Sequence, residues 1–259
     1  MTQQRVAVVT GGTSGIGLEV ARLLGASGHR IYLGARNDEN VSATVKQLRD
    51  QRIEADGSVV DVRSDASAHD FVQAAVDRWG PVDILVNSAG ISGGGVTADL
   101  PDEVWHNVID TNLNGVFRLT REVLNTGGMR EKSRGRIVNI ASTAGKQGVV
   151  LGAPYSASKH GVVGFTKALG NELAPTGITV NAVCPGYVET PMAQQVRRNY
   201  ARLWNASEEA VLAKFEAKIP LGRYSTPQEV AGLVGYLVTD AAAAITAQAI
   251  NVCGGLGNF

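Results

Sequence analysis

Apolar residues in this chain come in short runs that alternate with longer amphipathic stretches. The runs are rich in β-branched residues, which is typical of strands buried in a parallel sheet. Strands are expected near Val6–Thr10, Arg30–Ala35, Ala55–Val60, Ile84–Asn87, Gly135–Ala141, Ile178–Val183 and Ala249–Val252. Helices are expected between them, notably over Pro101–Thr126 and Ala153–Ala174.

This alternation predicts an α/β fold. Parallel strands joined by right-handed crossovers carry helices on both faces, so we expect a Rossmann-like, doubly wound, seven-stranded parallel sheet. At 259 residues and 44% apolar composition, the chain is long enough for one sizeable core. No linker interrupts it, so residues 1–259 are expected to form a single domain, with a lid-like helical insert at about 190–216.

Charge and cysteine content argue against several classes of function. Basic and acidic residues both number 24 and no basic block is present, so a nucleic-acid partner is not expected. The two cysteines, Cys184 and Cys253, are isolated, which argues against a clustered metal site and fits a reducing cytoplasm. No charged-then-apolar leader precedes the first strand, and the apolar stretch near 241–252 is too short to span a bilayer.

A glycine turn follows the first expected strand and opens a helix. Gly11, Gly15 and Gly17 give the spacing Gly-x-x-x-Gly-x-Gly, not the commoner Gly-x-Gly-x-x-Gly. Glycine lets a pyrophosphate approach the main chain, and the N–H groups and dipole of the next helix attract the anion. The order of strand, glycine turn and helix therefore predicts a dinucleotide site. The alternative is a bare turn between strand and helix.

Tyr155 and Lys159 supply candidate acid-base chemistry. Their spacing of four residues places them on one face of a helix. A phenol has a pKa near ~10, and a fixed cation beside it pulls that pKa toward neutral pH, where proton transfer is easiest. Taken alone, the pair is more typical of a surface contact with the ring half buried.

Several short motifs, in register, resemble the short-chain dehydrogenase/reductase family. They are Thr10-Gly11 through Gly17, Asp61-Val62, Asn87-Ser88-Ala89-Gly90, Asn112, Ser142, Tyr155 with Lys159, and Pro185-Gly186 followed by Thr190. The match runs from about Arg5 to the carboxyl end. Each motif is short, but together they are highly specific. The resemblance implies an oxidoreductase that interconverts a ketone and an alcohol with a nicotinamide cofactor.

The resemblance assigns catalytic roles to four residues. Tyr155 is expected to protonate the ketone oxygen, and Lys159 to lower the tyrosine pKa and hold the nicotinamide ribose. Ser142 is expected to donate a hydrogen bond to the substrate oxygen. Asn112 is expected to kink its helix and hold a water that links the lysine to solvent. A turn cap for Ser142 and a structural amide for Asn112 are the alternatives.

Cofactor preference follows from the end of the second expected strand. NAD enzymes usually place an acid there, whereas an arginine accommodates the extra phosphate of NADP. Gly34-Ala35-Arg36 has no acid until Asp38, which predicts NADPH with Arg36 as the phosphate partner; an exposed arginine is the alternative. Asp61 either contacts adenine or caps a turn. Further contacts implied by the resemblance are Gly11, Thr13, Ser14, Gly15, Ile16, Gly17, Asp61, Val62, Asn87, Ala89, Gly90, Tyr155, Lys159, Pro185, Gly186, Val188 and Thr190.

A narrower resemblance is to the ketoreductases of bacterial aromatic (type II) polyketide synthases. It rests on Gly93–Gly95 and on residues 145–149, 155–167, 183–192 and 251–259. It implies reduction of one ketone of a polyketide carried on an acyl carrier protein, in antibiotic biosynthesis. The alternatives are a 3-oxoacyl-carrier-protein reductase of fatty-acid synthesis, another secondary-alcohol dehydrogenase, or a non-enzymatic dinucleotide sensor, for which a broken set of catalytic residues would be expected.

The substrate pocket is expected between the glycine-rich loop and the insert. Gly93–Gly95 offers a flexible, backbone-rich wall, and the aromatic pair in the insert either covers a flat polyketone or belongs to ordinary core packing. Candidate substrate contacts are Ser92, Gly93, Gly94, Gln147, Val149, Tyr200 and Trp204. Ser92 stands where the relative that the chain most resembles has a proline, which leaves the configuration of the alcohol open. Ile91 stands where that relative has an arginine that could contact the carrier-protein phosphate, which leaves Arg63 as the candidate for that contact.

A homotetramer is expected because family members usually form dimers or tetramers through their two long helices. Apolar residues on these helices are compatible with an interface, or with packing on the sheet. They are Val104, Val108, Val116, Val162, Phe165 and Leu169.

Overall fold

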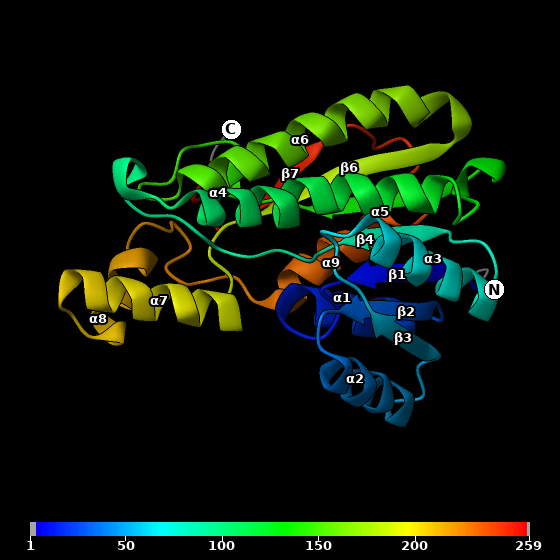
Figure 1. The fold of residues 1–259 in the computed structure, drawn as a ribbon, viewed down its shortest axis with the longest axis horizontal. Helices are drawn as coiled ribbons and strands as arrows, with labels where there is room; N and C mark the ends of the chain where they lie inside the picture. The colour runs from blue at the N-terminus through cyan, green and yellow to red at the C-terminus, as the bar shows by residue number, and fades with distance from the viewer. Residues whose placement is uncertain (1–3, 258–259) are drawn as a thin grey trace.

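Seven parallel strands form the centre of the computed structural model, which describes residues 4–257 (Figure 1). The strands are β1 (Val6–Thr10), β2 (Arg30–Ala35), β3 (Ala55–Val59), β4 (Ile84–Asn87), β5 (Gly135–Ile140), β6 (Ile178–Pro185) and β7 (Ala249–Val252). Their order in the sheet is β3-β2-β1-β4-β5-β6-β7. The order reverses between β1 and β4, and ligands of such sheets bind beyond the carboxyl ends of the strands at that point. The predicted doubly wound fold is confirmed.

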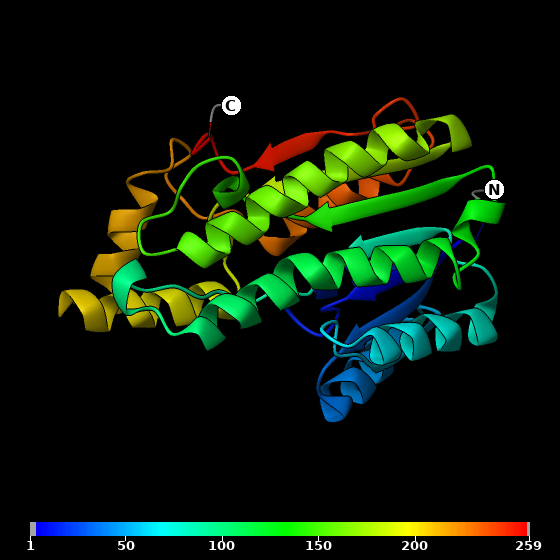
Figure 2. The same cartoon turned by 45° about the horizontal axis from the view of Figure 1, so that its top comes forward.

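Helices cover both faces of the sheet (Figures 1 and 2). One layer consists of α1 (Gly15–Ala26), α2 (Asp38–Asp50) and α9 (Pro227–Leu237). The other consists of α3 (Asp65–Trp79), α4 (Asp102–Ile109), α5 (Gly115–Leu124) and α6 (Ala153–Leu173). Short 3₁₀ turns occur at η1 (Thr97–Asp99), η3 (Met129–Glu131), η4 (Thr143–Gly145) and η5 (Ala174–Thr176). Strand residues alternate between the layers: Val9 and Val86 pack against the first, Val8 and Leu85 against the second.

The helix expected over residues 101–126 is interrupted. A π-helical turn, η2 (Asp110–Asn114), separates α4 from α5 and carries Asn112. Single π turns inside helices are frequent at functional sites, because the extra residue re-aims the side chains around it. The predicted distortion at Asn112 is therefore present as a wide turn.

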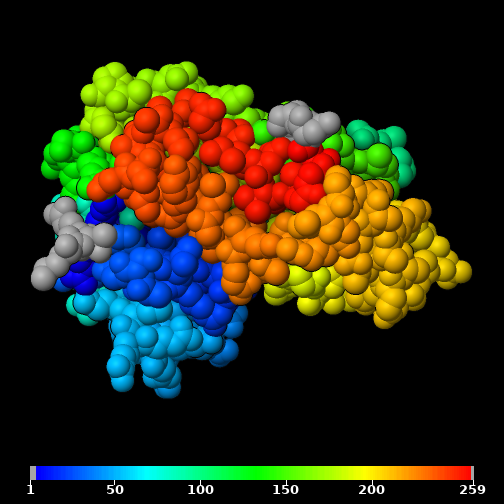
Figure 3. Space-filling view, turned by 180° about the vertical axis from the view of Figure 1, so that it is seen from behind, coloured from blue at the N-terminus to red at the C-terminus, as the bar shows by residue number. Residues whose placement is uncertain are grey.

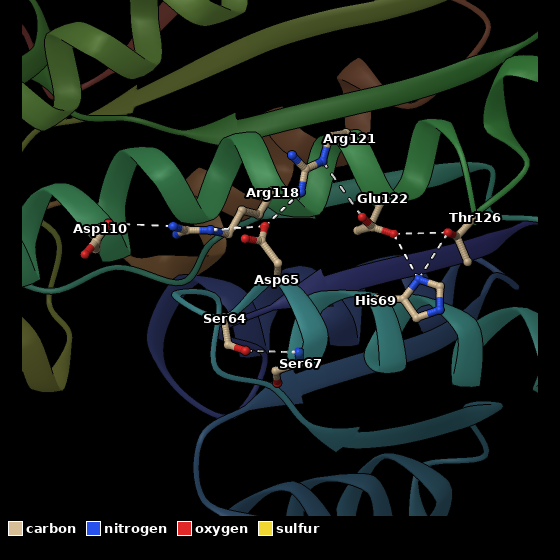
Figure 4. A network of polar contacts seen from close by, with 9 residues as sticks. All are labelled: Ser64, Asp65, Ser67, His69, Asp110, Arg118, Arg121, Glu122 and Thr126. Atoms are coloured by element: carbon tan, nitrogen blue, oxygen red, sulfur yellow. Dashed lines mark hydrogen bonds and ion pairs between the residues drawn. The ribbon is translucent and has the colours of Figure 1, made fainter.

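A polar network joins α3 to the outer side of this interrupted helix (Figure 4). Asp65 on α3 lies 2.8 Å from an Arg121 nitrogen and 3.4 Å from an Arg118 nitrogen on α5. Arg118 in turn reaches Asp110, the first residue of the π turn, at 3.8 Å. Ion pairs this exposed contribute ~0–1 kcal/mol each, so the network holds the two helices in register without dominating their stability.

The insert after β6 forms two helices that project beyond the end of the sheet (Figures 1 and 3). They are α7 (Pro191–Trp204) and α8 (Glu208–Glu216). Asn205, in the left-handed conformation at φ 48°, ends α7. The Phe215 ring packs edge-on against Tyr200 and Trp204, with ring centroids 5.2 and 5.8 Å apart, and this cluster holds the two helices together.

Two further findings concern the described residues as a whole. Within residues 4–257, no helix combines the length and apolar content needed to cross a membrane. In the same range, no group of three or more His, Cys, Asp or Glu side chains is arranged to hold a metal ion. Cys184 and Cys253 are both buried and form no disulfide.

Candidate active site

A cavity of about 630 Å³ lies at the carboxyl ends of the central strands, beneath α7. It is lined by the glycine turn, by the loops after β4, β5 and β6, and by α7 itself. The predicted cofactor and catalytic residues in its wall are Gly11, Ser14, Gly15, Ile16, Gly17, Ala89, Gly90, Ser142, Tyr155, Lys159, Pro185, Gly186, Val188 and Thr190. The predicted substrate contacts in its wall are Ser92, Gly93, Gly94, Gln147, Val149 and Tyr200. The fold thus brings residues from distant parts of the chain to one cavity.

The glycine turn has no room for side chains. A Cβ on Gly17 would lie 2.2 Å from the Gly11 carbonyl oxygen, and one on Gly11, at φ +65°, would lie 2.9 Å from the Ala89 backbone. Ser14 caps α1 by backbone geometry only, since its hydroxyl makes no capping hydrogen bond within the described residues. The first N–H groups of α1 therefore border the cavity, which fits the phosphates of a dinucleotide.

Tyr155 and Lys159 lie together on α6, as the spacing predicts. The Lys159 Nζ lies 5.8 Å from the centre of the Tyr155 ring. Burial raises the pKa of Tyr155, and a hydrogen bond with Ser142 opposes that increase. Desolvation of the phenolate is the larger of these two effects, so the net direction for the Tyr155 pKa is upward. The expected lowering of this pKa by Lys159 stays a prediction.

Lys159 itself is buried, with 5% of its surface exposed, and its Nζ donates to the Ile140 carbonyl oxygen at 2.8 Å. Burial lowers the pKa of Lys159 to about 8, against a smaller opposing effect of Cys184. At neutral pH the side chain is still charged, yet it is close to releasing its proton. A group with such a pKa exchanges protons readily near the working pH.

Ser142 is both a turn cap and a cavity residue. It follows β5, and its Oγ accepts a hydrogen bond from the Ala144 N–H at 3.0 Å at the start of η4. Accepting that bond leaves the hydroxyl proton available for donation. Ser142 is therefore a turn cap, as the alternative held, and its hydroxyl can still donate to a ligand.

Asn112 is fully buried in the π turn. Its Oδ1 accepts from the Ile91 N–H at 2.8 Å, and its Nδ2 donates to the Ile91 carbonyl at 2.9 Å and to Ser158 Oγ at 3.2 Å. Both amide hydrogens are therefore engaged by protein groups. The predicted water would have to bond to the remaining lone pairs of Asn112 or Ile91.

Five predicted cofactor residues lie outside the cavity wall. Asn87 is buried under it, where its amide donates to Thr120 and Asn139. Arg63 forms a bidentate contact with Asp61 at 2.7 and 2.9 Å and holds the pKa of that carboxyl at about 2. The remaining three are Thr13, which is half-buried, Val62, which is buried, and Arg36, which is exposed at the end of β2.

The Asp61 carboxylate also accepts from the Arg63 backbone N–H at 3.0 Å, as the turn-capping alternative requires. Arg63 donates further to Asn107 at 3.1 Å, so its guanidinium already has two protein partners. Contact with a cofactor stays a prediction for all five residues, which are Arg36, Asp61, Val62, Thr13 and Asn87.

The loop Gly93–Gly95 lies against the loop after β5, and its expected flexibility stays a prediction. The Gly95 N–H donates to the Leu151 carbonyl at 2.8 Å, and a Cβ on Gly94 would lie 1.9 Å from the same oxygen. Leu151 adopts the left-handed conformation, at φ 60°, to present that carbonyl. The two loops thus form one continuous wall of the cavity.

Trp204, predicted to contact substrate, packs behind the wall instead. Its ring lies against Phe215, and the Lys214 Nζ sits 4.2 Å from the ring centre. The i, i+4 spacing placed Tyr200 and Trp204 on one side of α7, but only Tyr200 reaches the cavity. Its hydroxyl donates to the Val150 carbonyl at 3.3 Å, so α7 touches the loop after β5.

Sequence reasoning missed part of the apolar wall. Tyr187 lies in a stack between Phe215 and Tyr224, with ring centroids 4.9 and 5.2 Å apart. Leu151 and Met192 complete the wall between the two loops and α7. Tyr187 and Met192 fall within the segment 183–192 that carried the narrower resemblance, so their proximity to the cavity was readable from the sequence, whereas the left-handed Leu151 was not.

Gly94→Ala is expected to impair binding of the ketone. The added methyl group must move the Leu151 carbonyl, which reshapes the wall but leaves the glycine turn alone. We expect KM for a bulky ketone to rise about ten-fold or more, with the NADPH dissociation constant unchanged. Steady-state kinetics and NADPH fluorescence test this; Gly164→Ala, where a Cβ meets open space, is the control. Equal KM values for both variants would contradict it.

Comparison with known proteins agrees with this geometry. The model of the short chain dehydrogenase family matches residues 5–201, so the chain belongs to that family. A protein described as a ketoacyl reductase of the monensin polyketide synthase, from Streptomyces virginiae, is 74% identical over 261 residues, covering 100% of both chains. A ketoacyl reductase from Streptomyces coelicolor is 61% identical, covering 98% of this chain and 97% of that one.

A crystal structure of a variant of actinorhodin polyketide ketoreductase with NADPH superposes on this fold with a TM-score of 0.97. The two chains are 60% identical, and the match covers 100% of this chain and 99% of that one.

Proposed function

We propose that the chain is an NADPH-dependent ketoreductase that reduces one ketone of a carrier-bound aromatic polyketide to a secondary alcohol. The observation that carries this proposal is the shared cavity, in which a phosphate-binding glycine turn and the set Ser142, Tyr155 and Lys159 face the same space. Relatives described as ketoacyl reductases of polyketide synthases, which are 74% and 62% identical to this chain, support the substrate class.

The glycine turn and α1 would hold the phosphates of NADPH, and Lys159 would hold the nicotinamide ribose. When bound, NADPH supplies the hydride that is transferred to the carbonyl carbon. Tyr155 donates its phenolic proton to the carbonyl oxygen, and Ser142 donates a hydrogen bond to the same oxygen as negative charge develops there. Burial raises the pKa of Tyr155, so the phenol holds a proton to donate, and the hydrogen bond with Ser142 lowers that pKa and favours its release.

Tyr155 must then regain its proton. Lys159, with a pKa of about 8, is suited to pass one on, because a group whose pKa lies near the working pH can both give up and take up a proton. Asn112 keeps the adjacent Ile91 backbone in place beside this route through its paired hydrogen bonds. Overall, the ketone gains one hydride and one proton and becomes the alcohol.

The substrate side of the cavity favours a large, flat ligand. Exposed apolar side chains stand at its wall, including Val149 and Met192, which are 40% and 39% exposed, and the Tyr187 and Tyr200 rings add aromatic surface. A polyketide tethered to an acyl carrier protein would place its rings there.

Substrate comparison tests the proposed function. Purified protein is mixed with NADPH and either a bicyclic ketone such as decalone or a straight acetoacetyl thioester, and NADPH consumption is followed. We expect turnover of the bicyclic ketone. Rapid turnover of the thioester with none of the bicyclic ketone would instead favour a fatty-acid 3-oxoacyl reductase. Tight NADPH binding without oxidation across a ketone panel would indicate a dinucleotide sensor.

Arg36→Ala is expected to reduce the preference for NADPH over NADH. The guanidinium is exposed at the end of β2, where the extra phosphate of NADPH would lie. We expect KM for NADPH to increase about ten-fold while KM for NADH changes little. Arg52→Ala, at an exposed turn after α2, is the control. An unchanged ratio of the two KM values would refute this role of Arg36.

We further propose a homotetramer and a cytoplasmic location. Val108, Val116, Val162 and Leu169 are buried within the chain, so they pack in its own core, as the alternative held. Phe117, 46% exposed, remains on the outer face of α5 and packs edge-on against Phe165. Light scattering tests the oligomeric state. The two buried thiols fit a reducing compartment.

A further inference from the structure

Ser158 links Asn112 to the helical turn that carries Tyr155 and Lys159. Its Oγ donates to the Tyr155 carbonyl oxygen at 2.7 Å and accepts from Asn112 Nδ2 at 3.2 Å. Both Ser158 and Asn112 are fully buried, so water cannot readily replace either partner. One hydroxyl thus joins the π turn to the first turns of α6.

The Asn112 side chain extends this link to a third element. Its other amide contacts fix both the N–H and the carbonyl of Ile91, in the loop that follows β4. That loop continues into Ser92 and Gly93 at the cavity wall. A single buried amide therefore connects the loop, the π turn and α6, and Ser158 is its contact on α6.

We propose that Ser158 is a positioning residue, which sets the place of Tyr155 and Lys159 relative to Ser142. The proposal rests on the proposed reductase function. Lys159 is anchored from the sheet side by the Ile140 carbonyl, and Ser142 follows the same strand. Ser158 holds the α6 turn that carries Tyr155 from the opposite side, through its contact with Asn112 in the π turn. Removing its hydroxyl leaves a buried Asn112 N–H without an acceptor, and the amide has to turn away to find one.

The same helix offers a matched control. Thr166 is also fully buried, its Oγ1 donates to the Val162 carbonyl at 2.7 Å, and it accepts from Asn139 Nδ2 at 2.9 Å. Its hydrogen-bonding pattern therefore repeats that of Ser158, farther along α6 from the cavity. Loss of the Thr166 hydroxyl removes a comparable structural bond without touching the Tyr155 turn.

The test compares Ser158→Ala, Ser158→Thr and Thr166→Val. Both hydroxyl deletions are expected to lower the melting temperature. Only Ser158→Ala is expected to lower kcat for ketone reduction, by about ten- to a hundred-fold, because a displaced donor loses alignment with the carbonyl oxygen. The NADPH dissociation constant should change much less than kcat, since the glycine turn that would hold the phosphates is untouched. Ser158→Thr, which keeps the hydroxyl, should recover most of kcat.

Titration of Lys159, followed by NMR of ¹³C-labelled lysine, gives a readout that does not need turnover. Ser158→Ala should shift the Lys159 titration and Thr166→Val should leave it in place. Wild-type-like kcat and Lys159 titration in Ser158→Ala, or equal losses of kcat in both deletions, would overturn the positioning role. A wild-type protein that reduces no ketone would refute the proposed function separately, and the titration would then decide the structural link by itself.

Discussion

Tyr155→Phe is expected to remove ketone reduction while NADPH binding is kept. The substitution deletes only the hydroxyl, so the ring stays beside Lys159 and the glycine turn is unchanged. Loss of a positioned general acid lowers kcat about 10²- to 10⁴-fold. Stopped-flow measurement of NADPH oxidation with a bicyclic ketone, together with NADPH fluorescence titration, gives both quantities.

Tyr32→Phe is the matched control for this experiment. Tyr32 is a buried tyrosine on β2 whose hydroxyl donates to Ser58 at 3.2 Å, away from the cavity. It should retain kcat. If Tyr155→Phe keeps a substantial part of wild-type kcat, the proton donor has been assigned to the wrong residue.

Lys159→Met is expected to abolish turnover and, at neutral pH, to stabilise the fold. Burial lowers the pKa of Lys159 from 10.5 to about 8, so keeping this charge inside costs about 3 kcal/mol below pH 8. Methionine fills similar space without a charge. The Ile140 carbonyl loses its donor, which offsets about 1–3 kcal/mol of the gain. Chemical denaturation should show a stabilisation of about 1 kcal/mol at pH 7.

The pH dependence of this difference has a definite sign. Between pH 8 and 10.5 the unfolded wild-type lysine holds more protons than the folded one, so the wild-type free energy of unfolding rises with pH. The wild type gains about 1.4 kcal/mol per pH unit over this range, so the advantage of Lys159→Met should shrink above pH 8 and reverse near about pH 9. Lys167→Met, an exposed position on the same helix, should change neither activity nor this slope. A stability difference independent of pH would show that the charge of Lys159 is not desolvated.

The sequence predicted the sheet and most of the cavity wall because their signals are local. Buried strands such as β1 and β4 read as continuous apolar runs, and the glycine turn is required by contacts within a few residues, as the 2.2 Å approach at Gly17 illustrates. Tyr155 and Lys159 were placed together by helical periodicity alone.

Local sequence patterns did not predict the features that depend on tertiary packing. The pKa of Tyr155 depends on how many atoms surround the phenol, which spacing along a helix does not encode. Trp204 turned toward Phe215 because α8 folds back beside α7 after the left-handed Asn205. The close contact between Gly94 and Leu151 joins loops more than fifty residues apart, so neither loop reveals it by itself.

The most direct test of the central claim is a crystal structure of the protein with NADPH and a bicyclic ketone. The account predicts that the Tyr155 and Ser142 hydroxyls both lie within hydrogen-bonding distance of the ketone oxygen, with the carbonyl carbon facing the nicotinamide ring. A Tyr155 hydroxyl directed away from the nicotinamide, beyond reach of the ketone oxygen, would contradict it.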